Sequence, residues 1–142
     1  MQTKMINTID MKDMMHLKLF SKITRIDTHF CFDYNETIFF CVPKPLLSRA
    51  IGEGAKNVRR INEIIHKKVR ILANPRGVED AKKFIEAIVK PVTFKEIQIT
   101  ENEIILNAGS QSKAALIGRN KRRLLEMQQI VADYFKRDFR II

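Results

Sequence analysis

Apolar residues in the first part of the chain follow a helical spacing and then a strand spacing. Asp10 can cap a helix over the residues that follow it. We expect the methionines of that helix, Met11, Met14 and Met15, to serve packing rather than function. Residues 28–42 are rich in aromatic and β-branched side chains around one polar break, and they therefore predict a hairpin of two strands.

Two helices joined by a glycine turn are predicted after the hairpin. Two prolines end the hairpin, and because proline suits the first turn of a helix, residues 46–51 are expected to form a short helix. Gly52 ends that helix, and a longer one begins near Ala55 with apolar residues on one face. The apolar run at residues 69–72 predicts a third strand, which completes one set of elements.

The second half of the chain shows the same order of elements. The sequence Asn-Pro-Arg-Gly at residues 74–77 is a strong turn signal, and the helix expected after it stops at Pro91. Strands are predicted at residues 94–99 and 103–106, with a polar turn between them.

The two halves superpose without a gap when Gly52 is placed on Gly118. Ile38 then falls on Ile104, and the hairpins, short helices and long helices coincide. We therefore predict a tail at residues 1–9 and two duplicated domains at residues 10–76 and 77–142. Each domain is expected to have an α+β fold, with a small three-stranded sheet and helices packed on one of its faces.

The charge of the chain points to an anionic partner. There are 26 Lys and Arg residues against 16 Asp and Glu, a formal net charge of +10, and nucleic acid or a membrane surface would offset the resulting self-repulsion. The apolar runs are much shorter than a membrane span, and the N-terminus lacks the apolar block of a signal peptide. We therefore expect a cytoplasmic protein with no membrane contact, whose cysteines, Cys31 and Cys41, are reduced apolar strand residues.

All the excess positive charge lies in two segments. Residues 44–76 carry nine basic and two acidic side chains, and residues 113–142 carry eight and three. Residues 1–43 have no net charge, and residues 77–112 have a charge of −2. A solubilising surface is one interpretation, but solubility would be served by charge anywhere on the protein. We favour a footprint for phosphate groups.

Each basic segment contains a glycine loop between its short and its long helix. Glycine lets backbone approach a ligand closely, and the first N–H groups of a helix are available to an anion. A glycine between two helices also serves simply as a C-cap, so it is the matching pair of loops that favours phosphate binding. The candidate binding residues are Gly52, Glu53, Gly54, Ala55, Lys56, Asn57, Arg59 and Arg60 in the first copy, and Gly118, Arg119, Asn120, Lys121, Arg122 and Arg123 in the second.

The loops at residues 52–55 and 118–121 resemble the Gly-x-x-Gly loop of KH domains, which holds about four nucleotides, with the bases in an adjacent apolar groove. The order of elements is similar to the type II KH arrangement, and two such domains in so short a chain resemble the archaeal NusA-like transcription factors. The resemblance implies a factor that binds nascent single-stranded RNA near RNA polymerase and influences termination or antitermination. No cofactor is implied.

Both loops depart from the Gly-x-x-Gly pattern at the second glycine, which is Ala55 in the first copy and Lys121 in the second. We expect these two residues in the first turn of their helices, where a side chain is tolerated. Glu53 places an acid in the first loop, whereas Arg119 places a base in the second. The second domain is therefore expected to contribute more of the electrostatic binding.

Neither catalysis nor metal binding is predicted. His16, His29 and His66 stand apart from carboxylates and cysteines, and no nucleotide-phosphate or zinc motif is present, so an enzyme is not expected. Two other functions remain open: a KH protein of ribosome assembly or translation, and a protein-interaction module whose altered loops no longer bind RNA. The aromatic residues expected in the core of the first hairpin are Phe30, Phe32, Phe39 and Phe40.

Overall fold

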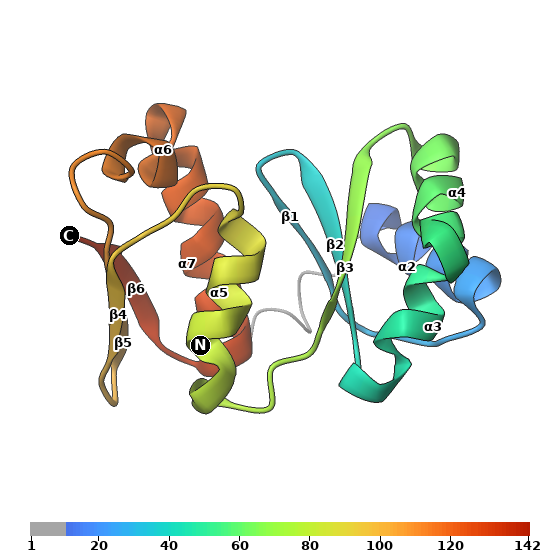
Figure 1. Cartoon of the computed structure of the whole chain (residues 1–142), viewed down its shortest axis with the longest axis horizontal. Helices are drawn as coiled ribbons and strands as arrows, with labels where there is room; N and C mark the ends of the chain where they lie inside the picture. The colour runs from blue at the N-terminus through green and yellow to red at the C-terminus, as the bar shows by residue number, and fades with distance from the viewer. Residues whose placement is uncertain (1–10) are drawn as a thin grey trace. The chain divides into compact units, whose positions relative to one another are not determined.

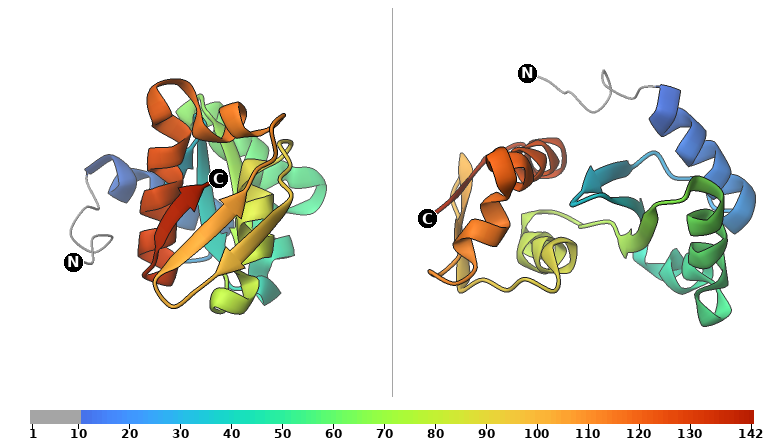
Figure 2. Two further views of the ribbon diagram at one scale, coloured as in Figure 1. Left: turned by 90° about the vertical axis from the view of Figure 1, so that its left-hand side faces the viewer. Right: turned by 90° about the horizontal axis from the view of Figure 1, so that it is seen from above.

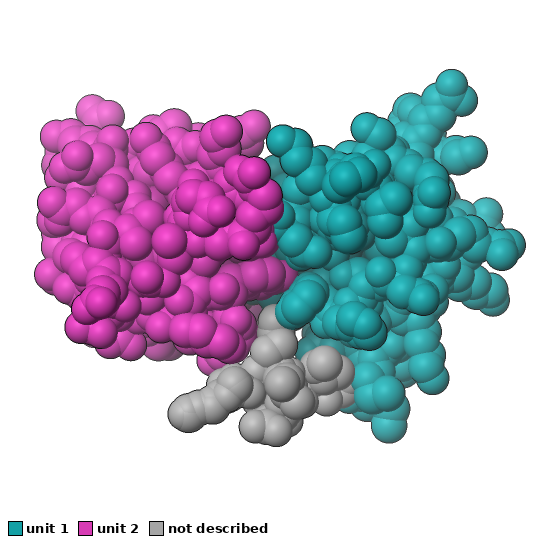
Figure 3. Space-filling view, turned by 90° about the horizontal axis from the view of Figure 1, so that it is seen from below, with its two compact units in different colours: residues 1–74 teal, residues 75–142 magenta. Residues whose placement is uncertain are grey.

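The computed structural model describes residues 11–142, and the chain divides after Asn74 into two compact units (Figures 1 and 3). The predicted tail at residues 1–9 and the cap at Asp10 lie outside the described residues. Each unit combines one three-stranded sheet with helices, so the expected α+β class is confirmed. Within residues 11–142, no helix is long and apolar enough to cross a membrane.

Unit 1 forms a sheet in which β2 lies between β1 and β3. β2 runs antiparallel to β1 and parallel to β3. The turn between β1 and β2 has positive φ at Asn35 and Glu36, the backbone that matches the twist of a tight hairpin. In chain order, the described elements are α2 (Met11–Thr24), β1 (Cys31–Tyr34), β2 (Thr37–Val42), the 3-10 turn η1 (Lys44–Leu46), α3 (Leu47–Ile51), η2 (Glu53–Ala55), α4 (Lys56–Ile65) and β3 (Lys68–Ala73).

Unit 2 repeats this topology, with β5 between an antiparallel β4 and a parallel β6. The register that places Gly52 on Gly118 holds as far as the long helix. The last strand is displaced from it, since Val69 pairs with Ile38 and Phe139 with Ile104. The cause is one extra helical turn, because α4 has 10 residues and α7 has 14. The elements are η3 (Val78–Asp80), α5 (Ala81–Val89), β4 (Glu96–Ile99), β5 (Glu103–Asn107), α6 (Lys113–Ile117), η4 (Arg119–Lys121), α7 (Arg122–Phe135) and β6 (Asp138–Ile141).

The helices of unit 1 cover one face of its sheet (Figure 2). Ile38, Phe40 and Val42, at alternate positions of β2, belong to this core and are at most 1% exposed. Phe20 of α2 stacks on Phe40 with 4.5 Å between ring centroids, and Ile61 of α4 is fully buried. Burial of each such side chain stabilises the fold by about 1.5–3 kcal/mol, so α2 and α4 are both anchored to the sheet.

The expectation that the methionines of α2 serve packing is wrong. Met11, Met14 and Met15 are 73%, 46% and 63% exposed. The core contact of α2 is instead made towards its C-terminal end, where Phe20 is fully buried and Ile23 is partly buried against the same cluster. A helical spacing of apolar residues identified the helix, but it did not identify which turns meet the sheet.

The aromatic residues of the first hairpin divide between core and surface. Phe39 and Phe40 are buried as expected, whereas Phe30, which precedes β1, is 37% exposed and is not core. Phe32 is half-buried, and its ring stacks on Phe39 with 5.1 Å between centroids. The guanidinium of Arg70 lies 5.3 Å from the Phe39 ring centre, and burial lowers the pKa of this arginine from its ordinary value.

Candidate nucleic-acid interface

The first glycine of each loop closes the short helix before it. Gly52 has φ 83° and ψ 158°, and Gly118 has φ 79° and ψ 170°, a backbone region that is essentially restricted to glycine. The N–H of Gly52 donates to the carbonyl of Ser48, and that of Gly118 to the carbonyl of Ala114. Both glycines are therefore C-caps, and the backbone requires them independently of any ligand.

The third and fourth residues of both loops adopt the left-handed conformation. The φ values are 62° at Gly54 and 60° at Ala55, and they are 56° at Asn120 and 61° at Lys121. The expectation that Ala55 and Lys121 lie in the first helical turn is therefore wrong, because each precedes its helix as the N-cap residue. A left-handed residue with a Cβ costs about 1–2 kcal/mol, so both loops hold a strained backbone.

Replacing Ala55 with glycine is expected to raise the free energy of unfolding by about 0.5–1 kcal/mol. The change removes the left-handed penalty, and the larger entropy of glycine in the unfolded chain offsets part of the gain. Urea unfolding followed by circular dichroism measures the difference. The matched control is Ala132→Gly, at an exposed right-handed position inside α7, where a loss of about 1 kcal/mol is expected. Equal losses of unfolding free energy in both variants would contradict the left-handed conformation of Ala55.

Backbone donors are available where each long helix begins. Each loop closes on itself, because the N–H of Ala55 donates to the carbonyl of Gly52 and that of Lys121 to the carbonyl of Gly118. The N-termini of α4 and α7 follow directly. The first N–H groups of a helix have no partner within it, and they carry partial positive charge. Each loop therefore combines a strained, glycine-dependent backbone with donors that an oxyanion can use.

The cations beside the first loop have unequal freedom to bind a ligand. The Nδ2 of Asn57 donates to the carbonyl of Ala50 at 3.0 Å, so this side chain ties α4 to the end of α3. Arg59 donates to a carbonyl of the loop. Lys56 and Arg60 are exposed and form no ion pair with another residue in the described part of the chain. These two are the available cations, with the exposed Glu53 near them in the sequence.

Beside the second loop, one carboxylate partly offsets two of the four cations. Glu126 lies 3.8 Å from Arg122 and 3.5 Å from Arg123, measured between nitrogen and oxygen. The i,i+4 and i,i+3 spacings of these residues are visible in the sequence and could have revealed the pairs. Arg119 and Lys121 are exposed and form no ion pair with any other described residue, so they are the principal cations of this loop.

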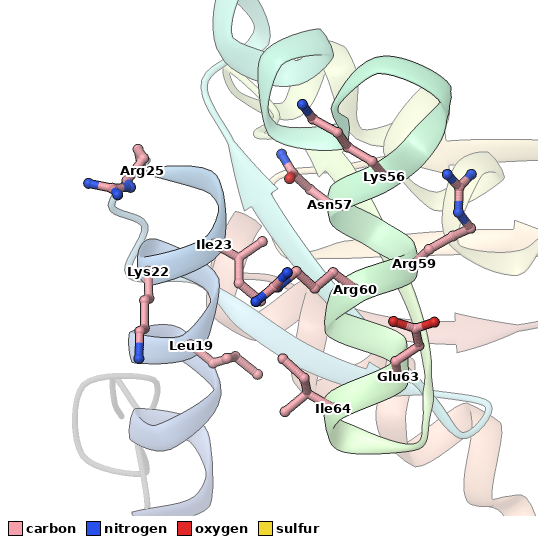
Figure 4. A pocket seen from close by; sticks show the side chains of 10 residues that line it. All are labelled: Leu19, Lys22, Ile23, Arg25, Lys56, Asn57, Arg59, Arg60, Glu63 and Ile64. Carbon is pink, nitrogen blue, oxygen red and sulfur yellow. The ribbon is translucent and has the colours of Figure 1, made fainter.

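A groove lies on each side of α4, and Arg59 lines both. The smaller groove, of about 290 Å³, separates α4 from β3. The larger one, of about 650 Å³, separates α4 from α2 (Figure 4). Lys22 and Arg25 of the larger groove were not predicted as binding residues, because residues 1–43 have no net charge. The residues that line the smaller groove are Thr37, Val58, Arg59, Asn62, Lys68, Val69 and Arg70.

Neither cysteine nor histidine forms a further site in the described part of the chain. Cys41 is buried in β2, Cys31 is half-buried in β1, and neither forms a disulfide. Over residues 11–142, no group of three His, Cys, Asp or Glu side chains is placed to hold a metal ion. The exposed loops offer backbone amides and cations, which can bind an anion.

Three relatives, each named "Probable transcription termination protein NusA", match the chain. The protein of Thermoplasma acidophilum is 23% identical over 132 residues, which cover 90% of each chain. That of Methanococcus vannielii is 26% identical over 100 residues, 69% of this chain and 56% of the relative. That of Methanocaldococcus jannaschii is 28% identical over 88 residues, which cover 62% of this chain and 46% of the relative. The match therefore spans about half the length of the last two.

A solved structure shares the fold. The protein of the "Crystal structure of APE1850" aligns with a TM-score of 0.63, covering 94% of this chain and 99% of its own, at 16% sequence identity. No protein-family model matches the chain.

Proposed function

We propose that the chain, which is similar to three proteins named as probable NusA, is a cytoplasmic RNA-binding transcription factor. Its two units act as type II KH domains, bind nascent single-stranded RNA through their glycine loops, and modulate elongation or termination. RNA polymerase is the partner that this role requires. The names of the relatives support the link to transcription termination, and the fold of the solved structure supports the two-unit architecture.

The repetition of one loop backbone carries this proposal. The two loops occupy matching positions in the repeat and have the same sequence of positive φ values, and each leads into a helix that begins with Lys or Arg. A surface that served only solubility would require the positive charge but not the repeated loop conformation. A phosphodiester uses both, because the amides position it and the cations attract it.

The groove between α4 and β3 supplies the place for bases in unit 1. Val58 and Val69 give it apolar walls, and Lys68 lies at its polar edge. A KH loop holds about four nucleotides with the bases in an adjacent apolar groove. Arg70 lines the same groove, and its guanidinium lies over the Phe39 ring.

Single-stranded RNA is expected to bind with a strong dependence on salt. If about five phosphates are neutralised, the logarithm of the affinity falls with the logarithm of salt concentration at a slope near −3.5, from about −0.7 per contact. Fluorescence anisotropy of a labelled RNA at several salt concentrations measures the slope. The absence of binding at low salt would overturn the proposal and favour a protein-interaction module.

A KH protein of ribosome assembly or translation would share these loops and this charge. The distinguishing observation is the partner. If the protein is purified from cells after nuclease-free lysis, polymerase subunits are expected with it under the transcription proposal. Ribosomal precursor RNA and ribosomal proteins, without polymerase, would favour the alternative.

A further inference from the structure

The groove between α2 and α4 has a positive rim and an apolar floor. Leu19 and Ile23 of α2 and Ile64 of α4 line it (Figure 4). Ile64 is 48% exposed. The cations along its rim are Lys22, Arg25, Lys56 and Arg60, and none of them forms an ion pair with another residue among residues 11–142.

Arg60 reaches across the groove, whereas the neighbouring acid does not. In Figure 4 the side chain of Arg60 extends from α4 towards Ile23, while Glu63 points away from α2. Glu63 is the one carboxylate in the lining. Arg60 therefore brings positive charge into the space between the helices, and no carboxylate of the lining faces that space.

The counterpart positions in unit 2 lack these features. In the register of the repeat, Arg60 corresponds to Glu126, which pairs with two arginines, and the exposed Ile64 corresponds to Ile130, which is 3% exposed. The open basic groove is thus a property of unit 1 rather than a consequence of the repeated fold. An exposed isoleucine among unpaired cations costs stability through repulsion and hydration, which a bound anion with an apolar surface would offset.

We propose that the α2–α4 groove binds a second stretch of single-stranded RNA beyond the nucleotides held at the first glycine loop. This inference rests on the proposed RNA binding and extends its track to the opposite side of α4. Lys22 and Arg25 contact phosphates, and the guanidinium plane of Arg60 together with Ile64 covers a base.

Continuity with the loop favours RNA over an acidic peptide as the occupant. Lys56, the first residue of α4, lines the groove and directly follows the left-handed pair of the loop. Arg59 lines this groove and the smaller groove on the other side of α4. A strand that meets the loop therefore has cationic surface on both sides of one helix, whereas a peptide partner would need no connection to the loop.

Lys22→Ala with Arg25→Ala tests the inference without altering either glycine loop. With an RNA of about twelve nucleotides, the Kd is expected to rise about fivefold and the salt slope to fall by about 1.4, the value for two lost contacts. With an RNA of about four nucleotides, the Kd is expected to stay within about twofold. The control is Lys12→Ala with Lys18→Ala, which removes the same charge from exposed positions of α2 outside the groove.

Crosslinking supplies a second readout. An RNA of the longer length carrying 4-thiouridine is expected to crosslink to α2 in the wild type and not in the Lys22→Ala, Arg25→Ala variant. Equal loss of affinity in that variant and in the control would overturn the inference. It would also be overturned if the substitutions weakened binding of a polyglutamate probe but not of RNA. If the wild type binds neither RNA, it is the proposed function that fails.

Discussion

Replacing Gly118 with alanine is expected to lower the free energy of unfolding of unit 2 by about 2–4 kcal/mol. About 1–3 kcal/mol of this comes from placing alanine in a backbone conformation restricted to glycine. The rest comes from steric overlap of the new Cβ with its neighbours. A Cβ at this position would lie 2.6 Å from the Cγ of Arg123 and 2.9 Å from its backbone nitrogen, and φ is +79°. The side chain can turn away, but the nitrogen belongs to the first turn of α7 and cannot. Urea unfolding, with hydrogen exchange of the β5 amides as the signal for unit 2, measures the loss.

Two other glycines provide graded controls. At Gly52 a Cβ would meet side-chain atoms of Lys56 and Asn57 at 2.9 and 3.0 Å, which can shift, so Gly52→Ala is expected to cost less than Gly118→Ala. At Gly54 it would meet nothing within 4 Å, and only the left-handed penalty of about 1–2 kcal/mol applies. Losses of equal size at all three positions would show that steric overlap does not distinguish them.

The glycines were predictable from sequence because their role is set by the local backbone. Gly52 and Gly118 lie between a short and a long amphipathic helix, and few residues other than glycine can make that junction. The register of the repeat was predictable for the same reason. The apolar residues of β2 and β5, and those of α4 and α7, occupy matching positions in the two units. Local pattern and fold agree over this stretch.

The features that sequence reasoning missed depend on contacts between elements. The exposure of Met11 and Met15 follows from which turn of α2 meets the sheet. Lys22 belongs to the positive groove only because α2 packs beside α4, and a charge count along the chain cannot show this. The left-handed backbone of Ala55 and Lys121 was missed because neither residue favours that conformation.

Arg119→Ala with Lys121→Ala is expected to raise the Kd for single-stranded RNA about tenfold near 0.1 M salt and to reduce the salt slope by about 1.4. These side chains are exposed and form no ion pair with other described residues, whereas Glu126 already offsets part of the charge of Arg122 and Arg123. The left-handed backbone at Lys121 accepts alanine as it accepts lysine, so the fold should be unchanged by circular dichroism.

The comparison that decides the ranking of the two loops is Lys56→Ala with Arg59→Ala. This pair is expected to weaken binding less, because Arg59 is already bonded to a loop carbonyl and the exposed Glu53 places a negative charge in this loop. Lys82→Ala with Lys83→Ala, at exposed positions of α5, controls for loss of net charge alone. If the first-loop variant is the weaker binder, unit 1 dominates the electrostatic contact, and the prediction that unit 2 does so is wrong.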